Sequence, residues 1–272
     1  MPGASRGTPN TEDYLLGRGR LFFAELGADG KPGPFRDLGN APEFRISITT
    51  EKITHKSSRE GTAFTDAEVV LSQEGTFNFQ LDEFNHDNYA LFTSGDKSSE
   101  TNAAVAGLTM TITNAQAGRW YDLEDSSGNR AYGIDPSKLD LEISGPTSLV
   151  KDLDYLVDER FGRIFIIEDG DGDGATITVT LAANALAPDL NAVRGMTKTT
   201  VKGALKFISV NPANNGFEEE IQFWKCSLTA DGDTSLIGDD WSNMPFSGTI
   251  ERNTAYPDNR SITIRHPGPP KT

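Results

Sequence analysis

The sequence has few of the residues that build disulfides and metal centres. Its 272 residues include one cysteine, Cys226, so no disulfide can form within the chain and no cysteine-based metal site can be assembled. The three histidines, His55, His86 and His266, lie far apart and match no zinc-binding spacing. These scarcities exclude disulfide-stapled secreted domains and the common zinc folds.

Long hydrophobic runs are missing as well. The longest apolar runs, such as residues 164–167, are far shorter than the roughly 20 residues of a membrane-spanning helix. Residues 1–13 are small and polar and contain no apolar centre of a secretory signal. We therefore expect a soluble protein that is made in a cytoplasm and has no membrane partner.

Basic residues are in short supply. Lys and Arg number 25 against 40 Asp and Glu, which gives a formal net charge of −15. Such an excess of negative charge argues against a protein whose whole surface grips nucleic-acid phosphates. It is compatible with a surface along which DNA slides without sticking.

Catalytic motifs are also absent from the sequence. It contains no G-x-S-x-G, no P-loop, and no G-x-G-x-x-G between a strand and a helix. Cys226 follows Trp224 in an apolar stretch, where a buried structural thiol is the common case. Paired carboxylates such as Asp122 and Asp125 arise by chance in an acidic chain, but glycosidase pairs have no local signature, so a hydrolase stays an alternative. We expect no enzyme, no catalytic residue and no cofactor.

Glycine (27) and proline (14) are plentiful, and apolar and polar residues alternate in many short stretches. This pattern predicts half-buried antiparallel strands joined by turns. Only residues 85–92, which start with an asparagine suited to cap them, predict a helix. The expected fold is mostly β, an antiparallel sandwich or barrel-like core with one short flanking helix. The predicted strands cover 18–25, 44–49, 77–82, 108–113, 161–167, 176–181, 201–210, 217–228, 246–251 and 261–265.

Residues 54–67 form an unusually long and charged connection between two predicted strands. Connections of this length inside compact domains are uncommon, and most are functional or disordered. We expect an arm that becomes ordered against a partner; a floppy surface loop is the alternative. The contact residues expected in the arm are His55, Lys56, Arg59, Glu60, Phe64 and Asp66.

The run 169–174 reads Asp-Gly-Asp-Gly-Asp-Gly, the opening of a calcium-binding loop. Asp169, Asp171 and Asp173 are thus weak metal candidates. However, the position of the closing bidentate glutamate is occupied by Thr180, and both flanks predict strands. We expect a solvated hairpin tip between strands 161–167 and 175–183, with no bound metal.

Aromatic residues leave a second function open. Trp120, Tyr121, Trp224 and Trp241 would suit a sugar-stacking platform, although scattered aromatics in strands are more often core or interface residues. The alternative is therefore a secreted or surface β-sandwich that binds glycans, with calcium held by the aspartate-rich run.

Several segments occur in an order that resembles the major tail tube proteins of long, non-contractile-tailed bacteriophages. The likeness covers residues 14–95 and 196–252 well and 118–182 more loosely, and its specificity comes from the order of the segments. They are Tyr14–Phe23, Leu38–Phe44, the helix with Asp87–Leu91, Lys202–Phe207, Asn214–Gly216, Trp224–Leu228, Ser235–Trp241 and Phe246–Glu251.

The resemblance implies a structural protein of the virion tail, assembled in the host cytoplasm. Members of that family form hexameric rings in which neighbouring sheets join into an inner barrel, and the rings stack into a tube. The implied partners are other copies of the chain, a tape-measure protein in the lumen, tail terminator and tail-tip proteins, and viral DNA that passes without tight binding.

The resemblance also divides the chain. Residues 14–100 and 191–265 correspond to the tail-tube core, 101–190 to an inserted β-subdomain placed outside the tube or adding strands to the core, and 1–13 and 266–272 to flexible tails. A lumen of the same sign as DNA would repel phosphates. The candidates for the lumen are Asn78, Gln80, Asp82, and either Glu218 and Glu220 or Glu219, depending on strand register.

Overall fold

The computed structural model describes residues 16–59, 61–100, 102–103, 107–143, 147–182, 190–212 and 217–266. The protein is mostly β with antiparallel sheets and one short α-helix, which confirms the predicted fold class. The chain divides into two compact units. The core unit comprises the chain up to Asp96 and from Val193 onward, and the inserted unit comprises Lys97–Ala192, against the 101–190 expected from the sequence.

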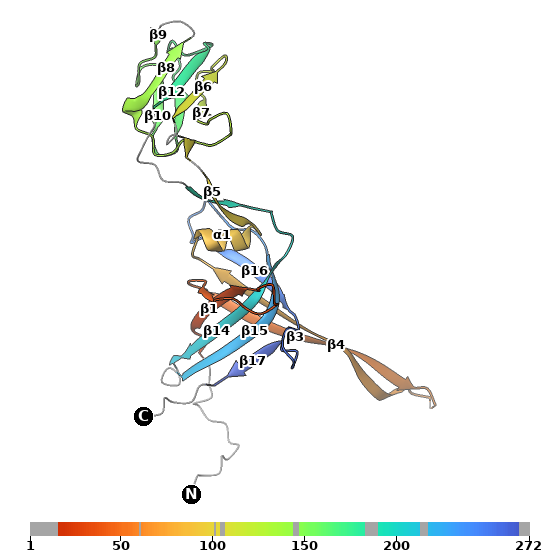
Figure 1. Ribbon diagram of the computed structural model, residues 1–272. Coiled ribbons are helices and arrows are strands. Elements are labelled where there is room, and N and C mark those ends of the chain that lie inside the picture. Colours follow the sequence, from red (N-terminus) through yellow and green to blue (C-terminus); the bar gives the residue numbers. More distant parts are fainter. Residues whose placement is uncertain are drawn as a thin grey trace, which may run out of the picture. The chain divides into compact units, whose positions relative to one another are not determined.

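One antiparallel sheet makes up most of the core unit (Figure 1). Its strands follow the order β2-β1-β14-β15-β16-β4-β3, and β17 pairs with β15 beyond the end of β16. Of the predicted strands, those near 18–25, 201–210, 217–228, 246–251 and 261–265 are confirmed. The bounds are β1 Gly19–Glu25, β2 Arg36–Asp37, β3 Glu43–Ser57, β4 Phe64–Leu81, β14 Val201–Asn211, β15 Phe217–Ala230, β16 Met244–Ile250 and β17 Ile262–Arg265.

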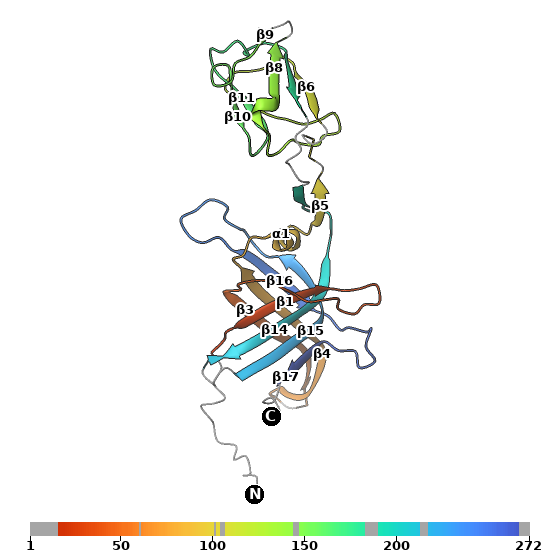
Figure 2. The ribbon, with the colours of Figure 1, turned by 60° about the vertical axis from the view of Figure 1, so that its left-hand side comes forward.

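This sheet curls around its own apolar face (Figure 2). Phe44 on edge strand β3 lies 5.3 Å from Phe207 of β14 between ring centroids, although three strands separate β3 and β14 in the sheet order. At Gly248 a side chain would collide with the ring of Phe77, so the glycine leaves room for that ring against the strand. The enclosed core contains Leu21, Phe23, Leu38, Phe77, Phe79, Leu81, Leu91, Val201, Leu205, Phe223, Cys226, Leu228, Met244 and Phe246.

The predicted helix is present as α1, His86–Phe92. The Asn85 side chain accepts a hydrogen bond from the Asn88 backbone N–H at 2.9 Å and so caps the first turn. Leu91 enters the core, and Phe92 stands edge-on to Phe246 with centroids 5.7 Å apart. Fully buried Asn88 donates to the carbonyls of Leu38 and Glu83, which ties the helix to the chain before and beside it.

The inserted unit is a small sandwich of two antiparallel sheets, β10-β11-β7 and β6-β12-β8-β9. Strands β5 (Asp96–Glu100) and β13 (Leu190–Arg194), at the two ends of the insertion, pair with each other. The shared core of the sandwich includes Leu123, Leu141, Ile164, Ile166, Ile177 and Val179. The other bounds are β6 Leu108–Ile112, β7 Trp120–Asp122, β8 Leu139–Ile143, β9 Thr147–Ser148, β10 Tyr155–Asp158, β11 Arg163–Ile166 and β12 Ile177–Leu181, with a 3-10 turn at Pro136–Lys138.

The hairpin-tip prediction for residues 169–174 is wrong. β11 pairs with β10 and β7, whereas β12 pairs with β6 and β8, so the aspartate-rich run crosses between the two sheets of the sandwich. Both flanking strands have buried residues on one face, and this pattern is the same for a hairpin and for a crossover. The sequence therefore located the strands but not their pairing.

The long connection expected at residues 54–67 is largely strand. β3 continues to Ser57 and β4 begins at Phe64, so that only the tip between them connects the two. The register shifts between Glu51 and Lys52 and again between His55 and Lys56. Each bulge adds one residue to β4, and neither face of the two strands is buried here, so the one-sided apolar alternation by which a strand is identified in a sequence is missing. Among the described residues, no helix is long and apolar enough to cross a bilayer.

Candidate assembly surfaces

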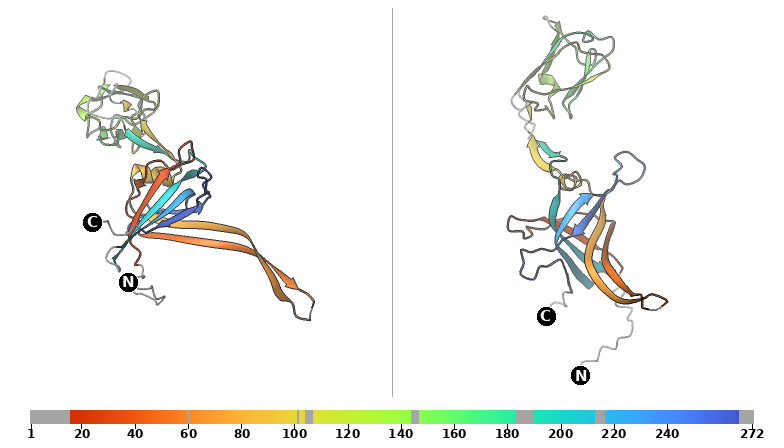
Figure 3. Two further views of the ribbon diagram at one scale, coloured as in Figure 1. Left: turned by 60° about the horizontal axis from the view of Figure 1, so that its bottom comes forward. Right: turned by 90° about the vertical axis from the view of Figure 1, so that its right-hand side faces the viewer.

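Strands β3 and β4 extend beyond the sheet as a two-stranded ribbon (Figure 3). β16 pairs with β4 only over Gly75–Leu81, so outward from the Ile48–Gly75 pair each strand has only the other as a neighbour among the described strands. We call residues 48–57 and 64–75 the ribbon. An isolated hairpin is marginally stable in water, so a ribbon of this length needs support from its own side chains or from a partner.

Cross-strand polar contacts support the ribbon from within. Lys52 Nζ lies 2.6 Å from Glu68 Oε1, and His55 Nδ1 lies 2.5 Å from Asp66 Oδ1. The Ser72 hydroxyl donates to the Glu51 carboxylate at 3.1 Å. These groups are exposed, so each pair contributes little on its own.

Of the expected arm residues, His55 and Asp66 are thus paired with each other. Lys56 lies on β3 opposite Thr65, and Phe64 opens β4 with its side chain 63% exposed. Arg59 lies in the exposed tip, and Glu60 lies outside the described residues.

Large apolar side chains line the ribbon and are exposed to solvent. Ile53 lies directly opposite Val69, and both are 57% exposed. The next pair, Lys52 and Val70, points to the other face because side chains alternate along a strand. Apolar residues are therefore exposed on both faces of the ribbon. The residues at least half exposed are Ile48, Ile53, Phe64, Val69, Val70 and Leu71.

A second exposed apolar group lies in the connection between β15 and β16. Leu236, Ile237 and Trp241 are 72%, 96% and 97% exposed. The same connection carries four aspartates, at positions 231, 233, 239 and 240. Exposure this complete for two aliphatic side chains and a tryptophan is typical of a contact site and unusual for a solvated loop.

The other face of the curled sheet is mostly polar along β4, β15 and β16, and apolar residues are interspersed with polar ones on β1 and β14. We call it the polar face; it comprises the residues that alternate with the core residues on each strand. Asn78 and Gln80 of β4 lie on it, and Asn78 pairs with Ser247 of β16. The hydroxyls of Ser227 and Thr249 lie 2.6 Å apart across β15 and β16. Asp82 follows the end of β4 and accepts a hydrogen bond from the Asn40 side chain at 2.5 Å.

The structure fixes the register that the sequence left open at Glu218–Glu220. Ile221 and Phe223 belong to the core side of β15, so Glu219 shares their side and Glu220 shares the polar face with Gln222. Glu218 lies on the polar face as well and is exposed.

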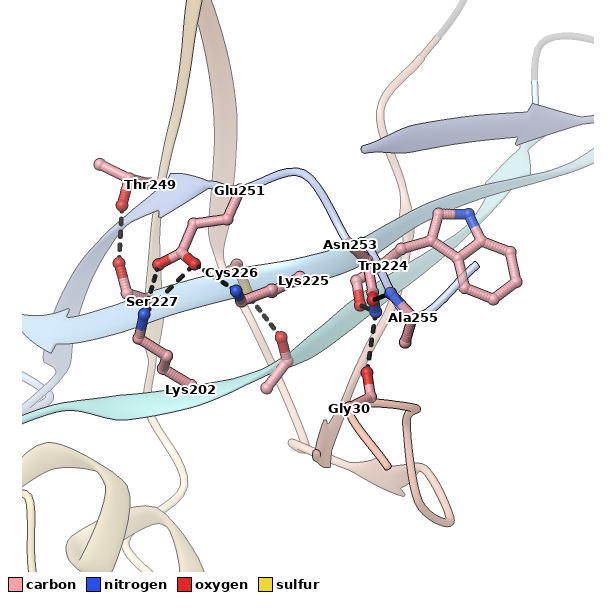
Figure 4. Close-up of polar contacts among 11 residues, drawn as sticks. Gly30, Lys202, Trp224, Lys225, Cys226, Ser227, Thr249, Glu251, Asn253 and Ala255 are labelled. Atoms are coloured by element: carbon pink, nitrogen blue, oxygen red, sulfur yellow. Dashed lines mark hydrogen bonds and ion pairs between the residues drawn. The ribbon is translucent and has the colours of Figure 1, made fainter. Parts of the chain in front are cut away.

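Two glutamates on the polar face each hold two cations. Glu251 lies 3.0 Å from Lys202 Nζ and 2.9 Å from Lys225 Nζ (Figure 4). Partial burial acts to raise the pKa of Glu251, but hydrogen bonds from Lys225 and Lys202 outweigh it and hold the pKa below its usual value. Glu220 pairs in the same way with Arg265 and, at 3.3 Å, with Lys206.

Net charge is unevenly distributed between the two units. The inserted unit carries 16 acidic and 7 basic residues, a net charge of −9, in 96 residues. The rest of the chain carries 24 acidic and 18 basic residues, a net charge of −6. Most of the excess therefore lies outside the unit that contains the curled sheet, and the total of −15 overstates what the polar face contributes.

Of the remaining sequence candidates, Cys226 and Trp224 are buried in the core unit, whereas Trp120 and Trp241 are exposed. Cys226 is buried and donates to the Gly203 carbonyl, and burial raises the pKa of its thiol to about 12, which confirms a structural thiol. Trp224 and Trp241 belong to the core unit and Trp120 to the inserted unit. Trp224 donates to the Thr263 hydroxyl at 2.7 Å and packs edge-on to Tyr256.

In the crossover between β11 and β12, one aspartate side chain accepts a backbone hydrogen bond, and another aspartate donates its own backbone N–H to a buried carboxylate. Asp173 accepts from the Ala117 N–H at 2.9 Å, and the Asp171 N–H donates to buried Asp154 at 3.1 Å. No group of three or more His, Cys, Asp or Glu side chains placed to hold a metal occurs in the part of the chain that the structure describes.

We expect the triple change Asp169→Asn, Asp171→Asn and Asp173→Asn to shift the melting temperature by less than about 2 °C, with or without calcium. Asn can keep the bond to Ala117 and tolerates the positive φ of 66° at position 169. Asp154→Ala is the matched control, because it removes the acceptor of the Val150 and Asp171 N–H groups and should cost about 1–3 kcal/mol. Calorimetry of the three proteins decides the point. If calcium raised the melting temperature of the parent protein but not that of the triple variant, the prediction that no metal binds here would be contradicted.

Comparison with known families places the chain. The model of a family described as "Protein of unknown function UCP028589" matches residues 14–262. The chain belongs to this family. A search of curated proteins found no match. Since the match runs through both units, the family pattern includes the inserted unit together with the curled sheet, the ribbon and the polar face.

Proposed function

We propose that the protein is the structural subunit of a bacteriophage tail tube, built from stacked hexameric rings that conduct the viral genome. The observation that carries the proposal is the ribbon. Its apolar residues are exposed on both faces and would be a liability in a protein that stays monomeric. Contact with a neighbouring ring would cover them.

The edge of the curled sheet also supports assembly. β3 is the last strand in the sheet order, so the outer edge of this 15-residue strand has no partner among the described strands. Proteins normally shorten, cover or bend such an edge, because it offers free backbone groups to another chain. In a closed ring, a strand of the adjacent subunit would pair with it, and the curled sheets would join into one barrel.

In this arrangement the polar face would line the lumen. Its Asn, Gln, Ser and Thr side chains offer weak, uniform contacts, and its lysines are held by Glu251 and Glu220. The exposed residues Leu236, Ile237 and Trp241 would contact other subunits or the tail terminator and tail-tip proteins. The tape-measure protein and then DNA would occupy the lumen without tight binding. The tail would assemble in the host cytoplasm, and the subunit would need neither catalytic residues nor a cofactor.

Electron microscopy and analytical ultracentrifugation of the purified protein test the proposal. We expect rings or hollow tubes whose fraction rises with concentration, because the contacts are between identical subunits. A protein that sediments as a monomer at every concentration, and forms no regular particle in the microscope, would refute the proposal.

A further inference from the structure

The outer face of the β10-β11-β7 sheet in the inserted unit carries an ordered aromatic row. Register places Leu156, Phe165 and Trp120 directly beside one another across the three strands. They alternate with Tyr155 and Ile164, which are buried in the sandwich, so the row faces away from the core. The Trp120 and Phe165 rings lie 5.2 Å apart between centroids.

This row is exposed. Trp120 is 47% and Leu156 is 40% exposed, and Phe161, in the turn before β11, is 50% exposed. The outer face of the opposite sheet of the same unit is polar, as is typical of a face that contacts only solvent. Its outward rows are Thr109, Thr180 and Asp140, then Thr111, Thr178 and Glu142.

A charged row runs beside the aromatic one, and its arginine stacks on two of the aromatic rings. Arg163 lies between Asp158 and Asp122 in the register, and its Nε donates to Asp158 at 2.9 Å. Its guanidinium carbon stands 4.6 Å from the Trp120 ring centroid and 5.5 Å from that of Phe161. Arg163 with Asp158, and Asp122 with its own partner Arg130, therefore present donors and acceptors along the edge of an apolar strip.

The size of the strip decides between a protein and a small ring as its occupant. A stable protein interface buries about 800 Å² on each partner. Aromatic side chains bury roughly 150–250 Å² each, so a few partly exposed apolar residues fall well short of that area. They match one or two sugar rings, whose C–H faces pack on aromatic rings while their hydroxyls hydrogen-bond to Arg and Asp. The net charge of −9 on the inserted unit disfavours an anionic ligand.

We propose that this face of the inserted unit binds neutral sugar rings of a polysaccharide, with Trp120 and Phe165 as the stacking platform and Arg163, Asp158 and Asp122 as hydrogen-bonding groups. The assignment does not rest on the proposed tube function. It would give the assembled particle many weak copies of a glycan-binding site, which together act by avidity.

The test uses the full-length protein against immobilised neutral polysaccharides (mannan, galactan and β-glucan), with the anionic polysaccharide alginate for comparison. We expect binding to at least one neutral polymer, about tenfold weaker in Trp120→Ala and partly restored in Trp120→Phe. Thr178→Ala, on the outer face of the opposite sheet, is the matched control and should bind like the parent protein. Circular dichroism checks that each variant is folded.

Three outcomes would overturn the proposal. They are failure of the parent protein to bind any neutral polymer, binding that is unchanged in Trp120→Ala, and binding to alginate alone. A fourth is a change of sedimentation in Trp120→Ala without any change in glycan binding, which would mark the face as a contact between copies of the chain. Particle formation in the microscope is scored separately, so failure here is distinguishable from failure of the tube proposal.

Discussion

A subunit in which residues 52–71 are replaced by an Asn-Gly turn should fold normally and form no tubes. Glu51 and Ser72 face each other in the register, so a two-residue turn can connect them where the ribbon is cut. The removed segment contributes no residue to the apolar core of the curled sheet. We therefore expect a melting temperature close to that of the parent protein, together with a complete loss of polymers in sedimentation and electron microscopy.

Point variants on the two faces of the ribbon make the same prediction quantitative. Ile53→Thr with Val69→Thr removes apolar surface from one face and keeps β-branched side chains, so the strands are retained. Each substitution removes about 1–2 kcal/mol of apolar burial at the contact, so a double variant loses about 2–4 kcal/mol of contact free energy. This loss raises the concentration needed for assembly roughly 30- to 700-fold. Val70→Thr with Ile48→Thr should do the same on the other face.

Thr50→Ser is the matched control for both double variants, because it changes an exposed ribbon position without removing a large apolar side chain. If only one of the two double variants weakens assembly, the ribbon contacts a partner through one face alone and does not lie between two partner surfaces. Normal tubes from the truncated protein would rule out the ribbon as an assembly element.

Much of the fold follows from alternation in the sequence, and the exceptions have physical causes. The 77–82, 108–113 and 176–181 patterns correspond to strands because each has one buried and one solvated face; the 44–49 pattern also corresponds to a strand, although its apolar side is largely exposed. The sequence does not predict β10 and β8, because β10 is four residues long and two of the five β8 residues are acidic, which lowers strand propensity.

Pairing between strands is the part that a single sequence does not reveal. The run Asp169–Gly174 looks like a hairpin tip because its flanks are strands, but it joins two different sheets. The ribbon looks like a loop because neither of its faces is buried and because two bulges interrupt the alternation of β4. The aromatic row of the inserted unit depends on cross-strand register, which aligns Leu156, Phe165 and Trp120 from three separate segments.

The contacts between charged groups on the polar face also cannot be predicted from the sequence alone. The sequence identifies Glu218, Glu219 and Glu220 as candidates but leaves their register open, and it gives no sign that Glu251 lies between Lys202 and Lys225. Those contacts join residues from β14, β15 and the end of β16. Because of these contacts, the expected weak binding of DNA depends on lysines that are paired with glutamates and not on the total charge of the chain.

Glu251→Gln combined with Glu220→Gln should turn a non-binding polar face into one that retains DNA. The two glutamates hold Lys202, Lys225, Lys206 and Arg265, and glutamine keeps the hydrogen-bonding shape while removing the charge. Six subunits per ring would then expose many cations at once. We expect tubes of normal appearance that bind duplex DNA at low salt. The logarithm of the binding constant should fall linearly with the logarithm of the salt concentration, with a slope of about 0.9 per phosphate contacted.

The matched control removes the same charge elsewhere. Asp140→Asn with Glu142→Gln lies on the outer face of the β6-β12-β8-β9 sheet of the inserted unit and should leave DNA binding at the parent level. A difference between the two double variants therefore reports the location of the charge, since the change in net charge is equal. Equal DNA binding by both would show that only total charge matters, and tight binding by the parent tube at physiological salt would contradict the conduit itself. In an infectious particle, the polar-face variant should slow genome ejection, because each newly exposed lysine adds a contact that the moving DNA has to break.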